Sequence, residues 1–209
     1  MRAFIYTGGR VVTDRVTEHP RADDMRIAAD AGYLTARALG DRVDLLVGDL
    51  DSLPEGDIPD GVELIRVPAE KDDTDTQLAI ELALERGADD IVMIGGLGGR
   101  IDHTLSNIAI LEDLSVRGVY AVMTDGRNRV RYLRSSSALI ARGGHKYLSI
   151  IAADERVRGV SIEGVRYPLK NATLTRRRQY AVSNEIVSNC ALISVRRGGI
   201  FIIESSDEG

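Results

Sequence analysis

The first 127 residues alternate short apolar runs with segments of helical pattern, and this alternation constrains the fold more than any other feature. The apolar runs are "RAFIYTGG", "RIAAD", "VDLLVGD", "VELIRVP", "DDIVMIGG" and "YAVMTDG". Helical patterns end at Gly40, follow Asp75, and continue through "TLSNIAILEDLSVRG". Strands separated by helices form a mostly parallel sheet that is covered on both faces. We therefore expect an α/β domain over residues 1–127.

Beyond residue 127 the pattern changes to short alternating runs with no convincing helix pattern. These runs are "NRVRYLRSS", "KYLSIIAA", "VSIEGVRYPL", "NATLTRR", "YAVSNEIV" and "CALISVRRGGIFIIES". Gly198 and Gly199 lie between two apolar runs, which predicts a hairpin turn. We expect an antiparallel β-sandwich domain over residues 128–209.

Composition narrows the classes of partner. The 209 residues are 44% hydrophobic and 28% charged, as in ordinary globular proteins, and the net charge of -5 makes nucleic acid an unexpected partner. No apolar run reaches the roughly 18 residues that a membrane helix needs. The single Cys190 permits no internal disulfide and fits a reducing compartment. We expect a cytoplasmic protein that binds neither nucleic acid nor membrane.

The stretch "VPAEKDDTDTQLAIELALERG" crowds four carboxylates around Lys71, namely Glu70, Asp72, Asp73 and Asp75. A helix is expected from Asp75, and Asp73 or Thr74 can cap it. Capping explains one or two of the carboxylates, because the helix dipole adds only about 0.3–1 kcal/mol for each. Taken alone, the cluster fits helix capping and a metal site equally well.

Polar residues follow four of the expected strands. In open α/β sheets, ligands bind beyond the carboxyl ends of the strands, so these segments should meet at one edge. Asp49 and Asp51, spaced i,i+2, can share one hydrated Mg²⁺. The four segments supply Asp30 and Gly32; Gly48, Asp49, Asp51 and Ser52; Lys71, Asp72, Asp73 and Asp75; and the loop "GGLGGR" with Arg100, Asp102 and His103.

The loop "GGLGGR" follows a strand and precedes a helix, as phosphate-binding loops do. It is neither the dinucleotide fingerprint, whose third glycine would fall on Ile101, nor a P-loop, which needs a lysine here. Arg100 suits phosphate oxygens or an ion pair with a neighbouring aspartate. Asp102 alone favours an N-cap of a helix starting near Thr104, and His103 favours a hydrogen-bonded structural role.

Together these segments predict transfer of a phosphoryl or pyrophosphoryl group from a nucleotide. Carboxylates would hold Mg²⁺, while Lys71 and Arg100 would stabilise the charge that develops in the transition state. The residues alone do not name the acceptor.

Five motifs in order resemble the thiamine pyrophosphokinase family. They are "ADAG" (29–32), "GDLDS" (48–52), "KDDTD" (71–75), "GGLGGRIDH" (95–103) and "SNE" (183–185). Each motif is weak by itself, but five in this order are specific, and they span nearly the whole chain.

The resemblance implies a cytoplasmic, Mg²⁺-dependent homodimer that transfers pyrophosphate from ATP to the hydroxyl of thiamine, giving thiamine diphosphate and AMP. Its active site would lie between the α/β domain of one subunit and the β domain of the other. By motif position, Asp73 would be the variable, capping member of its cluster. The implied roles are catalytic for Asp51, Asp75, Lys71, Asp72 and Arg100; nucleotide binding for Asp30, Gly32, Asp49, Gly98, Gly99 and Asp102; metal binding for Asp49, Asp51 and Asp75; and thiamine binding for Ser183 and Asn184.

The sequence departs from the family pattern at two places. Ala31 replaces the second glycine of the first motif, where a methyl group could block close backbone approach or a left-handed conformation. Arg176, Arg177 and Arg178 stand where the family has a small turn, either as a solvated basic edge or as a phosphate contact across the dimer.

Two other functions stay open from the sequence. One is a Mg²⁺-dependent phosphohydrolase with an aspartate nucleophile in "DLD", and the other is a non-catalytic nucleotide- or thiamine-binding protein. The product nucleotide separates these possibilities, because only pyrophosphoryl transfer to thiamine gives AMP.

Overall fold

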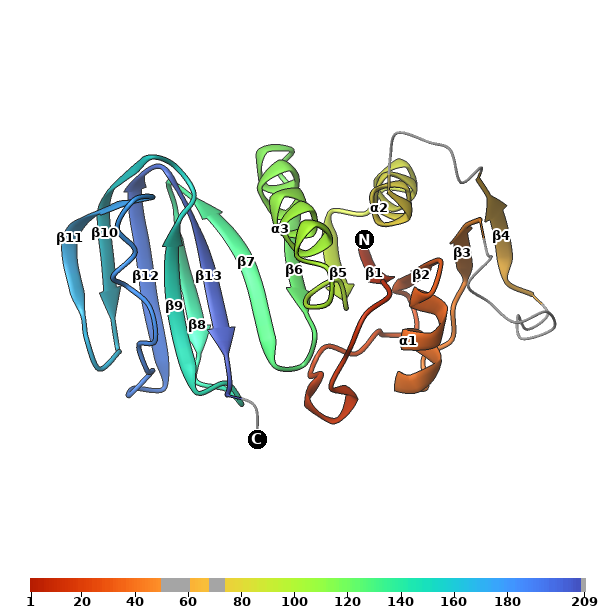
Figure 1. Ribbon diagram of the computed structural model, residues 1–209, viewed down its shortest axis with the longest axis horizontal. Helices are drawn as coiled ribbons and strands as arrows, with labels where there is room; N and C mark the ends of the chain where they lie inside the picture. Colours follow the sequence, from red (N-terminus) through yellow and green to blue (C-terminus); the bar gives the residue numbers. More distant parts are fainter. Residues whose placement is uncertain (50–60, 68–73, 208–209) are drawn as a thin grey trace. The chain divides into compact units, whose positions relative to one another are not determined.

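The computed structural model describes residues 1–49, 61–67 and 74–207. The chain folds into two compact units, Met1–Gly126 and Arg127–Gly209, called here the N-terminal and C-terminal units (Figure 1). The sequence pattern changes one residue later, at 127/128.

The N-terminal unit is built on a parallel sheet, in which the described strands have the order β4-β3-β2-β1-β5-β6. The strands are β1 (Arg2–Tyr6), β2 (Met25–Ala29), β3 (Leu45–Gly48), β4 (Glu63–Arg66), β5 (Asp90–Ile94) and β6 (Tyr120–Thr124). The helices are α1 (Gly32–Leu39), α2 (Asp75–Glu85) and α3 (Ile101–Val116), with a short 3₁₀ turn at Thr13–Arg15.

The inner strands of this sheet are buried on both faces, whereas the edge strand β4 is mostly exposed. One face joins Phe4, Ala28 and Leu46 to Tyr33 and Ala36 of α1 in a single apolar cluster. The strands bury their alternate residues as well, and α2 buries three residues outside that cluster, Ala79, Ile80 and Ala83. Strands buried on both faces require near-continuous apolar runs, as the sequence has. The expected α/β class is confirmed.

The helix starts settle two sequence alternatives. Thr74 caps α2, since its hydroxyl accepts from the Gln77 backbone N–H at 3.2 Å while Gln77 Oε1 accepts from the Thr74 N–H at 3.4 Å. The expected cap by Asp102 is wrong. Helix α3 already begins at Ile101, and the Thr104 N–H donates to the Arg100 carbonyl at 3.2 Å, so Asp102 lies within the first turn.

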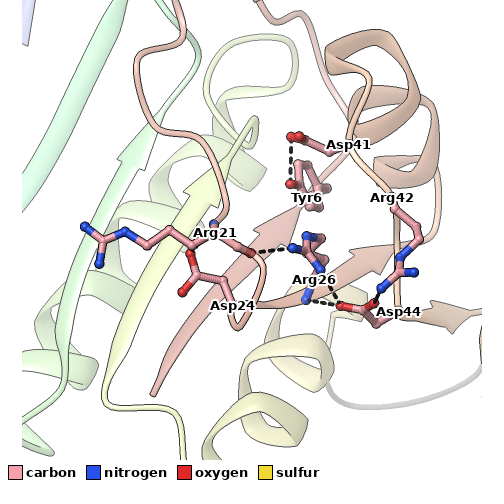
Figure 2. A network of polar contacts seen from close by, with 7 residues as sticks. All are labelled: Tyr6, Arg21, Asp24, Arg26, Asp41, Arg42 and Asp44. Atoms are coloured by element: carbon pink, nitrogen blue, oxygen red, sulfur yellow. Dashed lines mark hydrogen bonds and ion pairs between the residues drawn. The ribbon is translucent and has the colours of Figure 1, made fainter.

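A polar network ties β2 to the segment before β3 (Figure 2). Arg26 is mostly buried, and its guanidinium contacts Asp44 at 3.3 Å and the carbonyl of Arg21. The Tyr6 hydroxyl donates to Asp41 at 2.8 Å, and burial, followed by this bond, raises the pKa of Tyr6. Asp44 also accepts from the Arg26 backbone N–H, so the network fixes how β2 and β3 start side by side.

The C-terminal unit is an antiparallel β-sandwich. Strand β13 pairs with β7 and β9, and a second sheet has the order β11-β10-β12-β8. Buried residues of both sheets form one core, which includes Ile150, Val160, Ile193 and Ile202. The strands are β7 (Asn128–Arg134), β8 (Ser137–Ala141), β9 (Tyr147–Ala152), β10 (Arg156–Glu163), β11 (Leu169–Thr175), β12 (Cys190–Arg197) and β13 (Gly199–Ser205). The expected sandwich is confirmed.

Two local expectations in this unit are wrong. Gly198 and Gly199 do not form a hairpin turn: β12 pairs with β10 and β8, whereas β13 pairs with β7 and β9, so the chain changes sheet there. Two adjacent apolar strands can face each other across a core as well as pair edge to edge. The run "YAVSNEIV" is not a strand and makes only isolated bridges, and within it Ser183 takes a left-handed φ of 56°. Strand β8 was not expected from the sequence.

Candidate functional site

A cleft of about 530 Å³ opens at the carboxyl ends of β1, β2 and β5. The strand order places β1 between β2 and β5, and connections leave in opposite directions on its two sides. Such a reversal is where open α/β sheets bind ligands. The cleft is lined by residues 7–9 after β1, residues 29–31 at the end of β2, residues 74–76 at the start of α2, and Gly96, residues 98–100, His103 and Asn107.

Five of the expected site residues line this cleft. They come from three separate motifs and are Asp30, Asp75, Gly98, Gly99 and Arg100. Gly32 and Asp102 do not line it, although their neighbours Ala31 and His103 do. Asp49, which follows the end of β3, does not line it either. Asp51, Lys71 and Asp72 lie outside the described residues, as do Ser52, Glu70 and Asp73.

The ends of β2 and β3 touch at Asp30. Its backbone N–H donates to the Val47 carbonyl at 2.8 Å, and its φ is 45°. A Cβ on Gly48 would lie only 3.1 Å from the Asp30 Cβ, so glycine at 48 permits this approach. Asp49 directly follows Gly48, so Asp30 and Asp49 lie at the ends of two neighbouring strands.

The departure at Ala31 does not strain the backbone. Ala31 has a right-handed φ of -55°, which any residue adopts, and the left-handed residue is Asp30. The close approach occurs instead at Gly32, where a Cβ would lie 2.0 Å from the Tyr6 carbonyl oxygen. The motif thus keeps glycine where packing demands it, and the Ala31 methyl group adds to the cleft wall.

The glycine loop has a packed half and an open half. A Cβ on Gly95 would meet the Thr7 carbonyl oxygen at 2.6 Å, and one on Gly96 would meet Asn107 Nδ2 at 2.8 Å. Gly98 and Gly99 also have positive φ angles, 78° and 69°, but a Cβ on either would meet nothing within 4 Å. The first half therefore anchors the loop, while the second leaves its backbone accessible at the cleft.

Arg100 is paired with Asp102 by two bonds. Its Nη2 and Nε donate to the two carboxylate oxygens at 2.6 and 3.2 Å. The guanidinium, and after it the His103 backbone N–H, lower the pKa of Asp102 to about 2. Of the two sequence alternatives for Arg100, the ion pair is confirmed. His103, for which the sequence favoured a structural role, is exposed and lines the cleft.

The donor chemistry of the cleft fits a hard divalent cation. Mg²⁺ is usually held by one or two carboxylates together with substrate phosphate oxygens, and Asp30 and Asp75 both line the cleft. Within the described ranges there is no group of three or more His, Cys, Asp or Glu that could hold a metal on its own.

Sequence reasoning missed several residues that line the cleft. They are residues 7–9, Thr74, Thr76 and Asn107. A signal for the first group existed, since "YTGG" ends an apolar strand in the same way as the four segments that were selected. Asn107 gave no signal, because it lies inside a helical pattern.

The "SNE" segment lies in the C-terminal unit and is held by Asn184, whose exposed fraction is 5%. Its Oδ1 accepts from the backbone N–H groups of Tyr167 and Glu185 at 3.0 Å each, and its Nδ2 donates to the Tyr167 carbonyl at 2.8 Å. Ser183 is exposed, and its backbone N–H donates to Ser149 Oγ at 2.9 Å. The amide of Asn184 is thus bonded to backbone groups of this unit, while the Ser183 side chain is exposed.

Two family models match successive parts of the chain. "Thiamin pyrophosphokinase, catalytic domain" matches residues 18–123, and "Thiamin pyrophosphokinase, vitamin B1 binding domain" matches residues 138–200. No helix among the described residues is long and apolar enough to cross a membrane.

Relatives and solved structures agree with these matches. The thiamine pyrophosphokinase of Bacillus subtilis is 31% identical, over 85% of this chain and 82% of its own. Crystal structures of the Bacillus subtilis enzyme and of a thiamin pyrophosphokinase family protein from Enterococcus faecalis are similar, with TM-scores of 0.89 and 0.86 and identities of 26% and 31%. Each of these two comparisons covers 100% of both chains. The chain belongs to the thiamin pyrophosphokinase family.

Proposed function

We propose that this protein is a thiamine pyrophosphokinase that transfers pyrophosphate from ATP to the hydroxyl of thiamine in the presence of Mg²⁺, giving thiamine diphosphate and AMP. The observation that carries the proposal is the match of the catalytic-domain model to the unit that holds the cleft, followed by the vitamin B1 model on the β-sandwich.

The cleft is suited to the nucleotide. The open half of the glycine loop and the start of α3 offer backbone N–H groups to phosphate oxygens, and Gly98, Gly99 and Arg100 line it. Asp30, Gly32 and Asp102 would shape this part of the site, with Arg100 oriented by Asp102. Lys71 and Asp72 would complete the charge balance by their motif positions.

Asp49, Asp51 and Asp75 are the proposed Mg²⁺ ligands. Bound Mg²⁺ would neutralise triphosphate charge and so assist the transfer. In that transfer the thiamine oxygen forms a bond to the β-phosphorus, the bond from that phosphorus to the AMP oxygen breaks, and the hydroxyl proton is lost. The transition state is loose, so positioning and electrostatic stabilisation supply most of the catalysis.

Thiamine would be bound with the help of the C-terminal unit. Ser183 offers an exposed side chain, and Asn184 shapes the segment around it. We further propose a cytoplasmic homodimer, with an active site between the α/β unit of one subunit and the β-sandwich of the other. The single cysteine, Cys190, is free and suits a reducing compartment.

The product nucleotide tests this function. We expect AMP to form from ATP only when thiamine and Mg²⁺ are both present, and EDTA to abolish its formation reversibly. Robust formation of ADP would defeat the proposal, and phosphate release from a simple monoester would favour a phosphohydrolase. Light scattering coupled to gel filtration measures whether the chain is a dimer.

A further inference from the structure

We propose that Asn107 is a positioning residue that holds the glycine loop, residues 95–100, in the conformation that receives the phosphate chain of the nucleotide. The inference rests on the proposed function, in which this loop binds phosphate. It assigns to α3 a role that none of the five sequence motifs contains.

The contact comes from a buried amide. Asn107 has an exposed fraction of 7%, and its Nδ2 donates to the Gly96 carbonyl at 3.0 Å. One turn earlier, Thr104 Oγ1 donates to a carbonyl of the loop, that of Gly98 at 3.1 Å or that of Arg100 at 3.3 Å. Residues three apart share one face of a helix, so this face of α3 carries two donors that hold two carbonyls of the loop.

The loop fits closely around the Asn107 amide. Besides the 2.8 Å approach to Nδ2, a Cβ on Gly96 would lie 3.1 Å from Thr7 Oγ1. The Gly96 N–H is weakly bonded to the Gly8 carbonyl at 3.3 Å, and the Gly95 N–H donates to Thr124 at 2.8 Å. The packed half of the loop thus donates to the segment after β1 and to β6, and it accepts a bond from α3.

A loop held in one conformation should bind the phosphate chain of a nucleotide more tightly than a loop that must rearrange. Backbone N–H groups stabilise phosphate only when they are oriented before binding, since reorientation consumes binding free energy. Without the donor at position 107, the partly buried Gly96 carbonyl loses its partner and the loop can relax. The effect should fall on the nucleotide and not on thiamine.

The test is Asn107→Asp, which keeps the size of the side chain but removes the N–H donor and places a carboxylate beside a carbonyl. We expect the KM for ATP to rise about tenfold or more, with the KM for thiamine within about twofold of the parent. Thr104→Val, which removes the second donor at nearly constant volume, should raise the KM for ATP about threefold. It also keeps the test open if Asn107→Asp does not fold.

Leu114→Ala is the matched control, because Leu114 is fully buried on the same helix and does not line the cleft. It should lower the thermal midpoint but leave the KM for ATP unchanged. An unchanged KM for ATP in both loop variants would overturn the proposal, as would a rise that Leu114→Ala reproduces. If the parent forms no AMP, the proposed function fails; calorimetric titration with ATP and Mg²⁺ then measures the loop effect separately.

Discussion

The N-terminal and C-terminal units position their motif residues in different ways. In the first, parallel strands end at one edge, so Asp30, Asp75 and the glycine loop meet because the sheet is parallel. In the second, the "SNE" segment belongs to no strand and is held by individual hydrogen bonds, chiefly those of Asn184. The parallel strand order brings the cleft residues together, whereas hydrogen bonds of single side chains hold the "SNE" segment.

In both units, nevertheless, a buried asparagine holds the backbone of a neighbouring loop in place. Asn107 and Asn184 each donate Nδ2 to the carbonyl of a neighbouring loop, at 3.0 and 2.8 Å. A buried amide is costly unless it is bonded, so its bonds fix the backbone around it. An asparagine in or near a motif can therefore serve the site by holding the backbone of a loop.

The largest expected effect is on catalysis in the N-terminal unit. Asp75→Asn should lower AMP formation by about 100- to 1000-fold with the fold intact, because it removes a charge from the proposed metal site. Steady-state rates and circular dichroism measure this. Glu85→Gln, at the exposed end of the same helix, is the control. An unchanged rate would remove Asp75 from the site.

Alanine substitutions in the two halves of the glycine loop should lower the free energy of unfolding by different amounts. Gly96→Ala combines a left-handed backbone with a clash, which together cost roughly 2–5 kcal/mol in the free energy of unfolding. Gly98→Ala has a similar φ but open space, and should cost about 1–2 kcal/mol. Urea denaturation of both variants measures the difference. Equal losses would contradict the division of the loop into a packed and an open half.

In the C-terminal unit, we expect one substitution to lower stability and another to weaken thiamine binding. Asn184→Asp loses the donor to the Tyr167 carbonyl, so we expect the free energy of unfolding to fall by about 1–3 kcal/mol. Ser183→Ala should change stability by less than about 0.5 kcal/mol but raise the KM for thiamine. Thermal unfolding and thiamine titrations give both values. A stable Asn184→Asp variant would show that its bonds do not hold this segment.

The smallest effect is the pH dependence of the Arg100–Asp102 pair. Because the folded pKa of Asp102 is about 2, below the ordinary value of about 3.9, the pair stabilises the protein fully above pH 4 and loses this effect as pH falls toward 2. Asp102 is exposed, so the contribution is small. The difference in thermal midpoint between the parent and Asp102→Asn should be constant from pH 5 to 8 and vanish near pH 2. A change between pH 6 and 8 would implicate another group.

Much of the N-terminal unit was predictable, because apolar runs and helical periods are local. The strands, the three helices and the gathering of residues from three motifs in one cleft follow from that pattern and from the geometry of parallel sheets. The start of α3 was misjudged, since Arg100 and Asp102 bind each other and leave the helix to begin without a side-chain cap. The change of sheet at Gly198 was also missed, because an apolar pair of strands has the same pattern whether it forms a hairpin or spans a core.

The sequence by itself determined the two-part architecture, the family and the charged residues of the cleft, because hydrophobic period and motif order are written along the chain. Only the tertiary structure decided that β1 lies between β2 and β5, that residues 7–9 join the cleft, and that Asn107 and Asn184 hold loops. Strand order and the partner of a buried amide depend on contacts between residues far apart in the chain, and no local pattern records them.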